Sequence, residues 1–156
     1  MKNILAIDPG SAGGFAWHDG EKMCCTKMPA TPGDVLTLVS EVTLMNKIEV
    51  CVIEQIPKFT GAKLPGSSVA VLFENYGILQ GIIMARWLRL ERVTPQKWQK
   101  HFGLGTKKDA GTTTQWKNKL KAEAQRRFPT VDVTLATADA LLIWDYAMKQ
   151  MKEEPK

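Results

Sequence analysis

The sequence has few of the residues that build sulfur and imidazole frameworks. Its three cysteines, Cys24, Cys25 and Cys51, are an odd number without the spacing of a zinc site, and the adjacent pair is too close for an ordinary disulfide framework. Its two histidines, His18 and His101, also lack metal-ligand spacing. We therefore expect three reduced thiols and no zinc-type centre.

Long hydrophobic runs are scarce as well. No apolar run approaches the ~20 residues needed to cross a bilayer. The N-terminus opens directly into a strand pattern instead of a basic region followed by a cleavage site. We expect a soluble, cytoplasmic protein with no membrane partner.

With 156 residues, 44% of them hydrophobic and 24% charged, the chain has the length and composition of one globular domain with a core. We predict a single domain over residues 1–152 and a frayed C-terminal tail over residues 153–156. Lys and Arg outnumber Asp and Glu by 21 to 16, a net charge of +5 that favours a polyanionic partner.

The pattern of apolar residues and turn signals predicts an α/β layout with a mixed sheet and no internal repeats. A short apolar run feeds a glycine-rich turn, and Asp19-Gly20 suits a two-residue hairpin, so the first three strands form an antiparallel meander. The predicted strands are residues 3–8, 15–18, 21–27, 50–54 and 88–93, and the predicted helices are 31–45, 69–86, 94–102, 113–128 and 138–151.

The predicted helix at 69–86 carries apolar residues around much of its circumference. Such a helix suits burial on more than one side, and a partner subunit is one source of the extra cover. The stretch 57–68 has no periodicity and predicts a loop directly after a carboxylate-bearing strand, where loops tend to meet substrate.

Three carboxylates stand at the ends of predicted elements. Asp8 ends the first strand, Glu54 ends the strand after the first crossover, and Asp139 opens the final helix. Neighbouring strands lie about 5 Å apart, so all three can share one small volume. Because carboxylates that close repel one another, they suit Mg²⁺, and two such ions can activate a water and stabilise the leaving oxygen of a phosphodiester. Taken singly, each acid has an alternative role: Asp8 as a turn cap, Glu54 as the partner of a lysine, and Asp139 as a complement to the helix dipole.

Three blocks of sequence resemble, in order, the signature blocks of RuvC-type Holliday-junction resolvases, a branch of the RNase H-like nucleases. They are residues 4–11 (ILAIDPGS), 52–55 (VIEQ) and 137–142 (TADALL). Residues 76–81 resemble the long helix that this family uses for dimerisation, and residues 92–98 resemble its next strand-to-helix segment. The resemblance covers most of the chain.

This resemblance implies an RNase H-like fold, with a mixed five-stranded sheet whose first three strands are antiparallel, flanked by helices. It also implies a homodimer, joined through the 69–86 helix, that nicks four-way DNA junctions symmetrically in recombination and repair at the nucleoid. Asp8, Glu54 and Asp139 would be the catalytic metal ligands. The cofactor would be Mg²⁺, with Mn²⁺ as a substitute and two ions per site.

One departure from the family concerns a fourth carboxylate, which is common three or four residues before the last Asp. Here these positions are Ala136 and Leu135. Asp132 stands in as a ligand if residues 130–138 bend back, or Ala136 is a real loss that weakens one metal site while leaving DNA binding intact. Both alternatives stay open.

Two groups of residues are candidates for DNA contact. Phe59, flanked by Lys58 and Lys63 in the 57–68 loop, lies where the family places an aromatic near the junction crossover, and loop anchoring is the alternative. A basic tract suits phosphate contacts, although such runs are usually solvated helix faces. Its members are Lys107, Lys108, Lys117, Lys119 and Lys121, with Arg126 and Arg127, and the first four are the candidate DNA contacts. Trp98 and Trp116 are interpreted as packing residues.

Other functions fit parts of this pattern. The same fold serves nucleases that act on RNA–DNA hybrids or flaps, and Ala136 keeps open a junction-binding module without turnover. Half of a sugar-kinase or actin-like ATPase also begins with a strand, an Asp and a glycine-rich turn. The short chain and the lack of a second phosphate-binding block argue against that ATPase.

Overall fold

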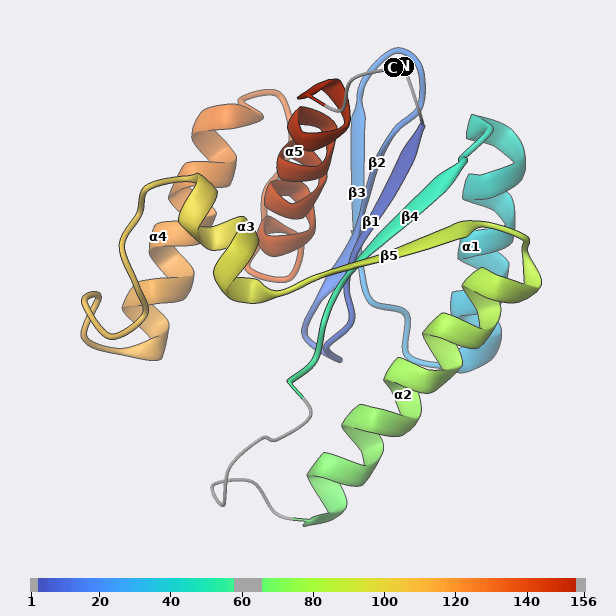
Figure 1. The fold of residues 1–156 in the computed structure, drawn as a ribbon, viewed down its shortest axis with the longest axis horizontal. Helices are drawn as coiled ribbons and strands as arrows, with labels where there is room; N and C mark the ends of the chain where they lie inside the picture. The colour runs from blue at the N-terminus through green and yellow to red at the C-terminus, as the bar shows by residue number, and fades with distance from the viewer. Residues whose placement is uncertain (1–2, 58–65, 154–156) are drawn as a thin grey trace.

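The computed structural model describes residues 3–57 and 66–153, which fold around a five-stranded mixed sheet in the order β3-β2-β1-β4-β5 (Figure 1). β1 pairs antiparallel with β2 and parallel with β4, so it is the central strand. The strands are β1 (Ile4–Asp8), β2 (Gly14–His18), β3 (Met23–Lys27), β4 (Val50–Glu54) and β5 (Arg89–Val93). The predicted mixed sheet with three antiparallel strands is confirmed.

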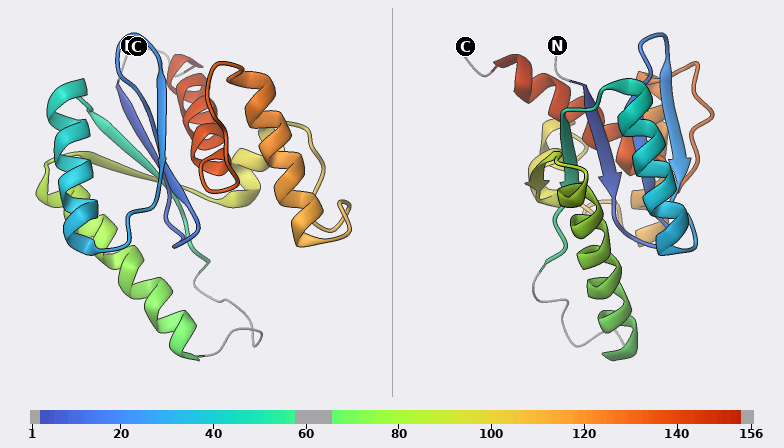
Figure 2. Two further views of the ribbon diagram at one scale, coloured as in Figure 1. Left: turned by 180° about the vertical axis from the view of Figure 1, so that it is seen from behind. Right: turned by 90° about the vertical axis from the view of Figure 1, so that its right-hand side faces the viewer.

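Helices cover both faces of the sheet (Figures 1 and 2). α1 and α2 pack against one face, and α3, α4 and α5 lie on the other, where α5 packs directly on β1 and β2. The helices are α1 (Pro32–Asn46), α2 (Gly66–Ala85), α3 (Pro95–His101), α4 (Thr113–Arg127) and α5 (Ala138–Glu153).

The alternation of side chains along β1 divides the core in two. Ile4 and Ala6 pack with the helices of the α5 face, whereas Leu5 and Ile7 pack with α1 and α2. Successive side chains of a strand point to opposite faces, so the apolar run of β1 is buried on both sides. The same parity decides which way the acid at the end of the strand points.

Local signals fix where two of these helices begin. The Thr31 hydroxyl accepts a hydrogen bond from the Asp34 backbone N–H at 3.1 Å, and Pro32 occupies the first turn of α1. Thr112 and Gln115 form a reciprocal capping box at the start of α4. Because each start is pinned, side chains one turn further along these helices have defined directions.

α2 differs from what the sequence predicted. It begins at Gly66, three residues earlier than expected, and one 18-residue window has a mean hydropathy of 1.4. By length and composition alone it could cross a membrane, so the expectation that no run approaches that length is wrong on this measure. Within one chain it buries a single stripe, and Val71 and Met84 are 53% and 58% exposed.

The two outer strands of the sheet are β3 and β5. β5 is short and charged, and its Arg89 forms an ion pair with Glu91 at 2.8 Å. The residues of β5 are exposed or half-buried except for Val93. Residues 154–156, which belong to the tail predicted to fray, lie outside the described residues, so that expectation stays a prediction.

Candidate active site

Strand parity brings Asp8 and Glu54 to the same face of the sheet. Asp8 follows Ile4 and Ala6 in the alternation of β1, and Glu54 follows Val50 and Val52 in β4, all of which pack on the α5 side. β1 and β4 are parallel neighbours with Ile7 opposite Ile53. The two carboxylates therefore leave adjacent strand ends toward α5.

The first turn of α5 delivers the third carboxylate. Asp139 is the second residue of this helix. The turn before it is closed by the buried Thr137, whose hydroxyl accepts a hydrogen bond from the Thr134 backbone N–H at 3.0 Å. Since α5 packs on β1 and β2, its first turn lies beside the strand end that carries Asp8.

Electrostatics show that the three acids share one neighbourhood. Burial raises the pKa of all three, to about 8 for Glu54 and about 7 for Asp139. After burial, the charge of Asp8 is the largest cause that raises the pKa of Glu54 and of Asp139, and Asp139 adds to the effect on Glu54. The three acids thus lie within range of one another's charge, and their joint role as metal ligands stays a prediction.

Lys117 is the cation that acts on all three acids. Its charge lowers the pKa of Asp8, Glu54 and Asp139, against the larger effect of burial. It lies half-buried on α4, beside the buried stripe of Trp116 and Leu120. The sequence placed Lys117 in a phosphate-binding tract, but its position distinguishes it from the exposed lysines of that tract, Lys107, Lys108 and Lys119.

Sequence reasoning missed the role of Trp98. This tryptophan is fully buried, as expected of a packing residue, yet its indole N–H donates a hydrogen bond to Oε2 of Glu54 at 2.7 Å. The bond holds the pKa of Glu54 lower than burial and the neighbouring acids would set it. A tryptophan in the first turn after Thr94-Pro95 gives no sequence signal of a contact with residue 54.

The glycine-rich turn after β1 is shaped around Asp8. A Cβ at Gly13 would lie 2.6 Å from Cγ of Asp8, and one at Gly14 would lie 2.8 Å from the backbone oxygen of Ala136. Only glycine permits both approaches without a shift of the backbone. The turn is closed by a hydrogen bond from the Gly13 N–H to the Gly10 carbonyl at 2.8 Å.

The donor set fits a hard divalent cation, because it consists of three buried carboxyl groups and Lys117 is the cation that the described residues place among them. Within the described residues, no three His, Cys, Asp or Glu side chains stand in an arrangement that could hold a metal ion directly. The three carboxylates are close enough to affect one another's pKa, but their side chains would have to move to bind one ion together.

Asp132 is placed apart from this group. It is exposed in the turn before α5, and its charge raises the pKa of Cys25 in β3. It is not among the charges that act on Asp8, Glu54 or Asp139. Ala136, the position of the missing fourth acid, lies instead with its backbone against Gly14.

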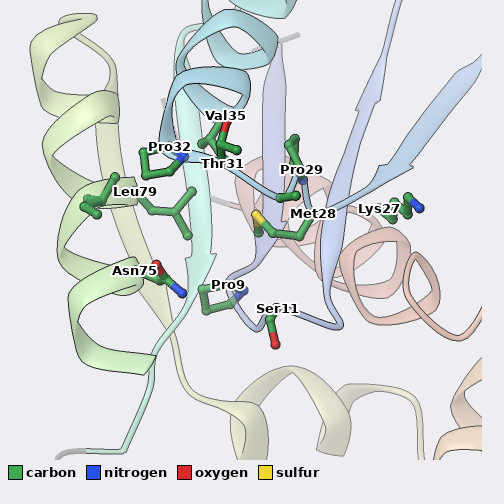
Figure 3. A pocket seen from close by; sticks show the side chains of 12 residues that line it. Pro9, Ser11, Lys27, Met28, Pro29, Thr31, Pro32, Val35, Asn75 and Leu79 are labelled. Atoms are coloured by element: carbon green, nitrogen blue, oxygen red, sulfur yellow. The ribbon is translucent and has the colours of Figure 1, made fainter. Parts of the chain in front are cut away.

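Two hollows are lined by residues close to the acids in sequence, one by Pro9 after Asp8 and one by Pro57 after Glu54. One, of about 940 Å³, lies between α3 and the 103–111 segment and is lined by Lys100, Lys107, Lys108 and the neutral Pro57 and Trp116. The other, of about 440 Å³, lies between α2 and the segment that joins β3 to α1. In Figure 3, Asn75 of α2 points toward Pro9, directly after Asp8. The candidate DNA contacts Lys58, Phe59 and Lys63 lie outside the described residues.

By sequence, the chain matches no family model and no curated protein. Its fold is similar to that of T. thermophilus RuvC in complex with Holliday junction substrate, at 14% identity and a TM-score of 0.60 over 96% of both chains. A further Thermus thermophilus RuvC structure matches at 14% identity and a TM-score of 0.62 over 99% of both chains.

The yeast mitochondrial Holliday junction resolvase Ydc2 is also similar, at 12% identity and a TM-score of 0.50. That match covers 97% of this chain and 80% of the yeast chain. The chain thus has the RNase H-like fold of the RuvC-type resolvases, which confirms the fold implied by the sequence blocks.

Proposed function

We propose that this chain is a metal-dependent endonuclease that hydrolyses phosphodiester bonds at four-way DNA junctions. The observation that carries the proposal is the convergence of Asp8, Glu54 and Asp139 at one end of the sheet, in a fold that RuvC uses on a Holliday junction substrate. We infer that the protein acts in the cytoplasm, on nucleoid DNA.

In this proposal the three carboxylates hold Mg²⁺, or Mn²⁺ in its place. When bound there, the ions would supply an activated water as nucleophile and stabilisation of the leaving 3′ oxygen. The Asp8 carboxylate accepts a hydrogen bond from the Gly10 N–H at 3.4 Å and that of Glu54 from the Trp98 N–H, so the protein contributes oriented ligands. Lys117 offsets part of the repulsion among the acids when no cation is bound.

The basic hollow beside α3 is the proposed path of the DNA strand that leads from the cut. Lys100, Lys107 and Lys108 line it together with the Gln96 and Gln99 amides. Cationic and amide donors suit phosphate and sugar oxygens and read no sequence. This arrangement supports selection by branch geometry instead of by base edges.

We propose that α2 joins two copies of the chain. Two symmetric nicks require two active sites related by a two-fold axis, and a helix on that axis meets its own copy. The exposed Val71 and Met84 lie on the apolar helix that a single chain covers on one stripe only. A membrane is the alternative cover, and the solution mass of the protein separates the two.

The proposal is tested by incubating the wild-type protein with labelled four-way junction, flap, duplex and RNA–DNA hybrid, each with Mg²⁺, Mn²⁺ or EDTA. We expect paired symmetric nicks in the junction, in the metal arms only. Cleavage confined to the hybrid or the flap would move the protein to another RNase H-like activity. Metal-independent cleavage would contradict the mechanism.

A second candidate is a junction-binding module with weakened turnover, which Ala136 favours because the fourth acid is missing. This candidate predicts tight junction binding without cleavage in either metal. Ala136→Asp sharpens the test, because a restored carboxylate should raise cleavage if its loss is what limits turnover. An unchanged, fully active Ala136→Asp variant would show that three acids suffice.

A further inference from the structure

Trp98 is unusual among the buried aromatic residues because its polar atom is aimed at the acid cluster. The side chain is 0% exposed and packs in the core of the α5 face, with its ring edge against Phe102 at a centroid distance of 6.3 Å. An indole N–H only donates, so it can pair with a carboxylate oxygen but cannot itself bind a cation.

Backbone pairing between β4 and β5 fixes where Trp98 lies relative to Glu54. Glu54 lies opposite Val93 in the β4–β5 register, and the Gln55 N–H donates to the Val93 carbonyl at 2.8 Å. α3 begins two residues later at Pro95, so Trp98 is set one turn into a helix whose start is tied to the strand beside Glu54. Neither partner can move far without disturbing that pairing.

The hydrogen bond engages one oxygen of the carboxylate. Trp98 Nε1 lies 2.7 Å from Oε2 of Glu54. Within residues 3–57 and 66–153, no other side chain forms a hydrogen bond with the Glu54 carboxylate. No described residue donates a hydrogen bond to Oε1. Partners that orient a ligating side chain in this way are commonly worth 10- to 100-fold in metal affinity or activity.

We propose that Trp98 is a positioning residue that fixes the Glu54 carboxylate for cation binding, with Oε2 held by the indole and Oε1 presented to the metal. The inference rests on the proposed function, in which Glu54 is a metal ligand. It goes further by assigning a second role to a core residue.

The test compares Trp98→Phe with wild type by calorimetric titration of Mn²⁺ into the metal-free protein and by the Mn²⁺ dependence of junction cleavage. We expect Mn²⁺ affinity to fall about 10- to 100-fold. Cleavage should recover at saturating Mn²⁺, and junction binding in EDTA should stay within about twofold of wild type. A merely structural role would instead lower junction binding and leave the Mn²⁺ midpoint unchanged.

Trp144→Phe is the matched control, because Trp144 packs against the same core and its buried indole N–H has no hydrogen-bond partner in the described part of the chain. It should leave the Mn²⁺ midpoint unchanged.

If Trp98→Phe does not fold, replacing Trp98 with benzothienylalanine removes the N–H while keeping the ring shape. Unchanged Mn²⁺ affinity in the variant that folds would overturn the inference, whereas a wild type that binds no Mn²⁺ would overturn the proposed function itself.

Discussion

The helices on the two faces of the sheet are buried to different extents. On the α5 face, the first half of α5 is buried almost completely, including Ala140, Leu141 and Ile143, and the core encloses Trp98 from α3. On the other face, α2 buries Tyr76, Leu79 and Ile83 and leaves Val71 and Met84 exposed. Figure 1 shows α2 continuing past the end of the sheet.

We therefore propose that the α5 face carries the metal chemistry and that α2, on the other face, carries the contact between copies of the chain. Burial raises the pKa of the Asp8, Glu54 and Asp139 carboxyls, so the α5 face is where a cation would be held strongly. An apolar helix that stays exposed in one chain indicates an interaction surface.

Asp8→Asn should abolish metal-dependent junction cleavage while preserving junction binding, because it removes a ligand and also reduces the negative charge that faces the phosphates. Cleavage is read on gels and binding by fluorescence anisotropy in EDTA. Glu41→Gln, an exposed acid of α1 on the other face, is the control and should be fully active. Full activity in Asp8→Asn would reject the assignment of chemistry to the α5 face.

Val71→Glu and Met84→Glu should each weaken self-association roughly tenfold to a hundredfold, which corresponds to about 1.4–2.8 kcal/mol. A carboxylate buried at the interface without a partner is costly, whereas the monomer exposes both sites and should stay folded. Analytical ultracentrifugation measures the change. Leu44→Glu, at a 77% exposed site on α1, should leave the mass unchanged. A wild-type protein that stays monomeric at micromolar concentration contradicts assembly through α2.

The metal-free protein should lose stability as the pH rises from about 5 to 8. The folded pKa values of Glu54 and Asp139, about 8 and about 7, lie above their unfolded values of 4.5 and 3.8, so the unfolded chain releases protons first across this window. We expect a loss of about 1–3 kcal/mol, or roughly 3–10 °C in Tm.

Differential scanning fluorimetry in EDTA measures this slope, and Mg²⁺ should flatten it by binding the ionised acids. Glu54→Gln should reduce the slope by removing one of the two groups, whereas Glu41→Gln on α1 should not. A Tm that rises over the same pH range would mean that the carboxylates are not held in the buried, mutually repelling state described above.

The smallest effect is expected from the exposed lysines of the basic hollow. Lys107→Ala and Lys108→Ala should weaken binding of all DNA sequences alike and reduce the slope of log Kd against log salt by about one each. The control is Lys22→Ala, because Lys22 lies in the β2–β3 hairpin, at the end of the sheet away from Asp8. An unchanged slope would place the DNA elsewhere.

Much of the fold was predictable because its signals are local. The apolar runs that end at Asp8 and Glu54, the Asp19-Gly20 turn and the Thr-Pro start of α3 each identify an element from neighbouring residues alone. Even the shared face of the two acids follows from strand parity. The predicted final helix, residues 138–151, matches α5 to within two residues at its end.

The rest depends on how helices dock. The Trp98–Glu54 hydrogen bond joins residues 44 apart in sequence, and the orientation of α3 decides it. Lys117 left a weak signal, since it borders the buried stripe of Trp116 and Leu120, but the lysines around it favoured a solvated face. The exposure of α2 was hidden for a related reason: an apolar sequence indicates that a helix needs cover and does not say which molecule provides it.

The charged outer strand β5 has a consequence for how copies of this protein can meet. Its unpaired backbone edge is flanked by the Arg89–Glu91 ion pair, and desolvating those charges would oppose the addition of another strand. The sheet is therefore guarded against lengthening into a continuous ribbon of copies. High concentrations on DNA, where basic proteins crowd together, should then yield discrete particles instead of fibres.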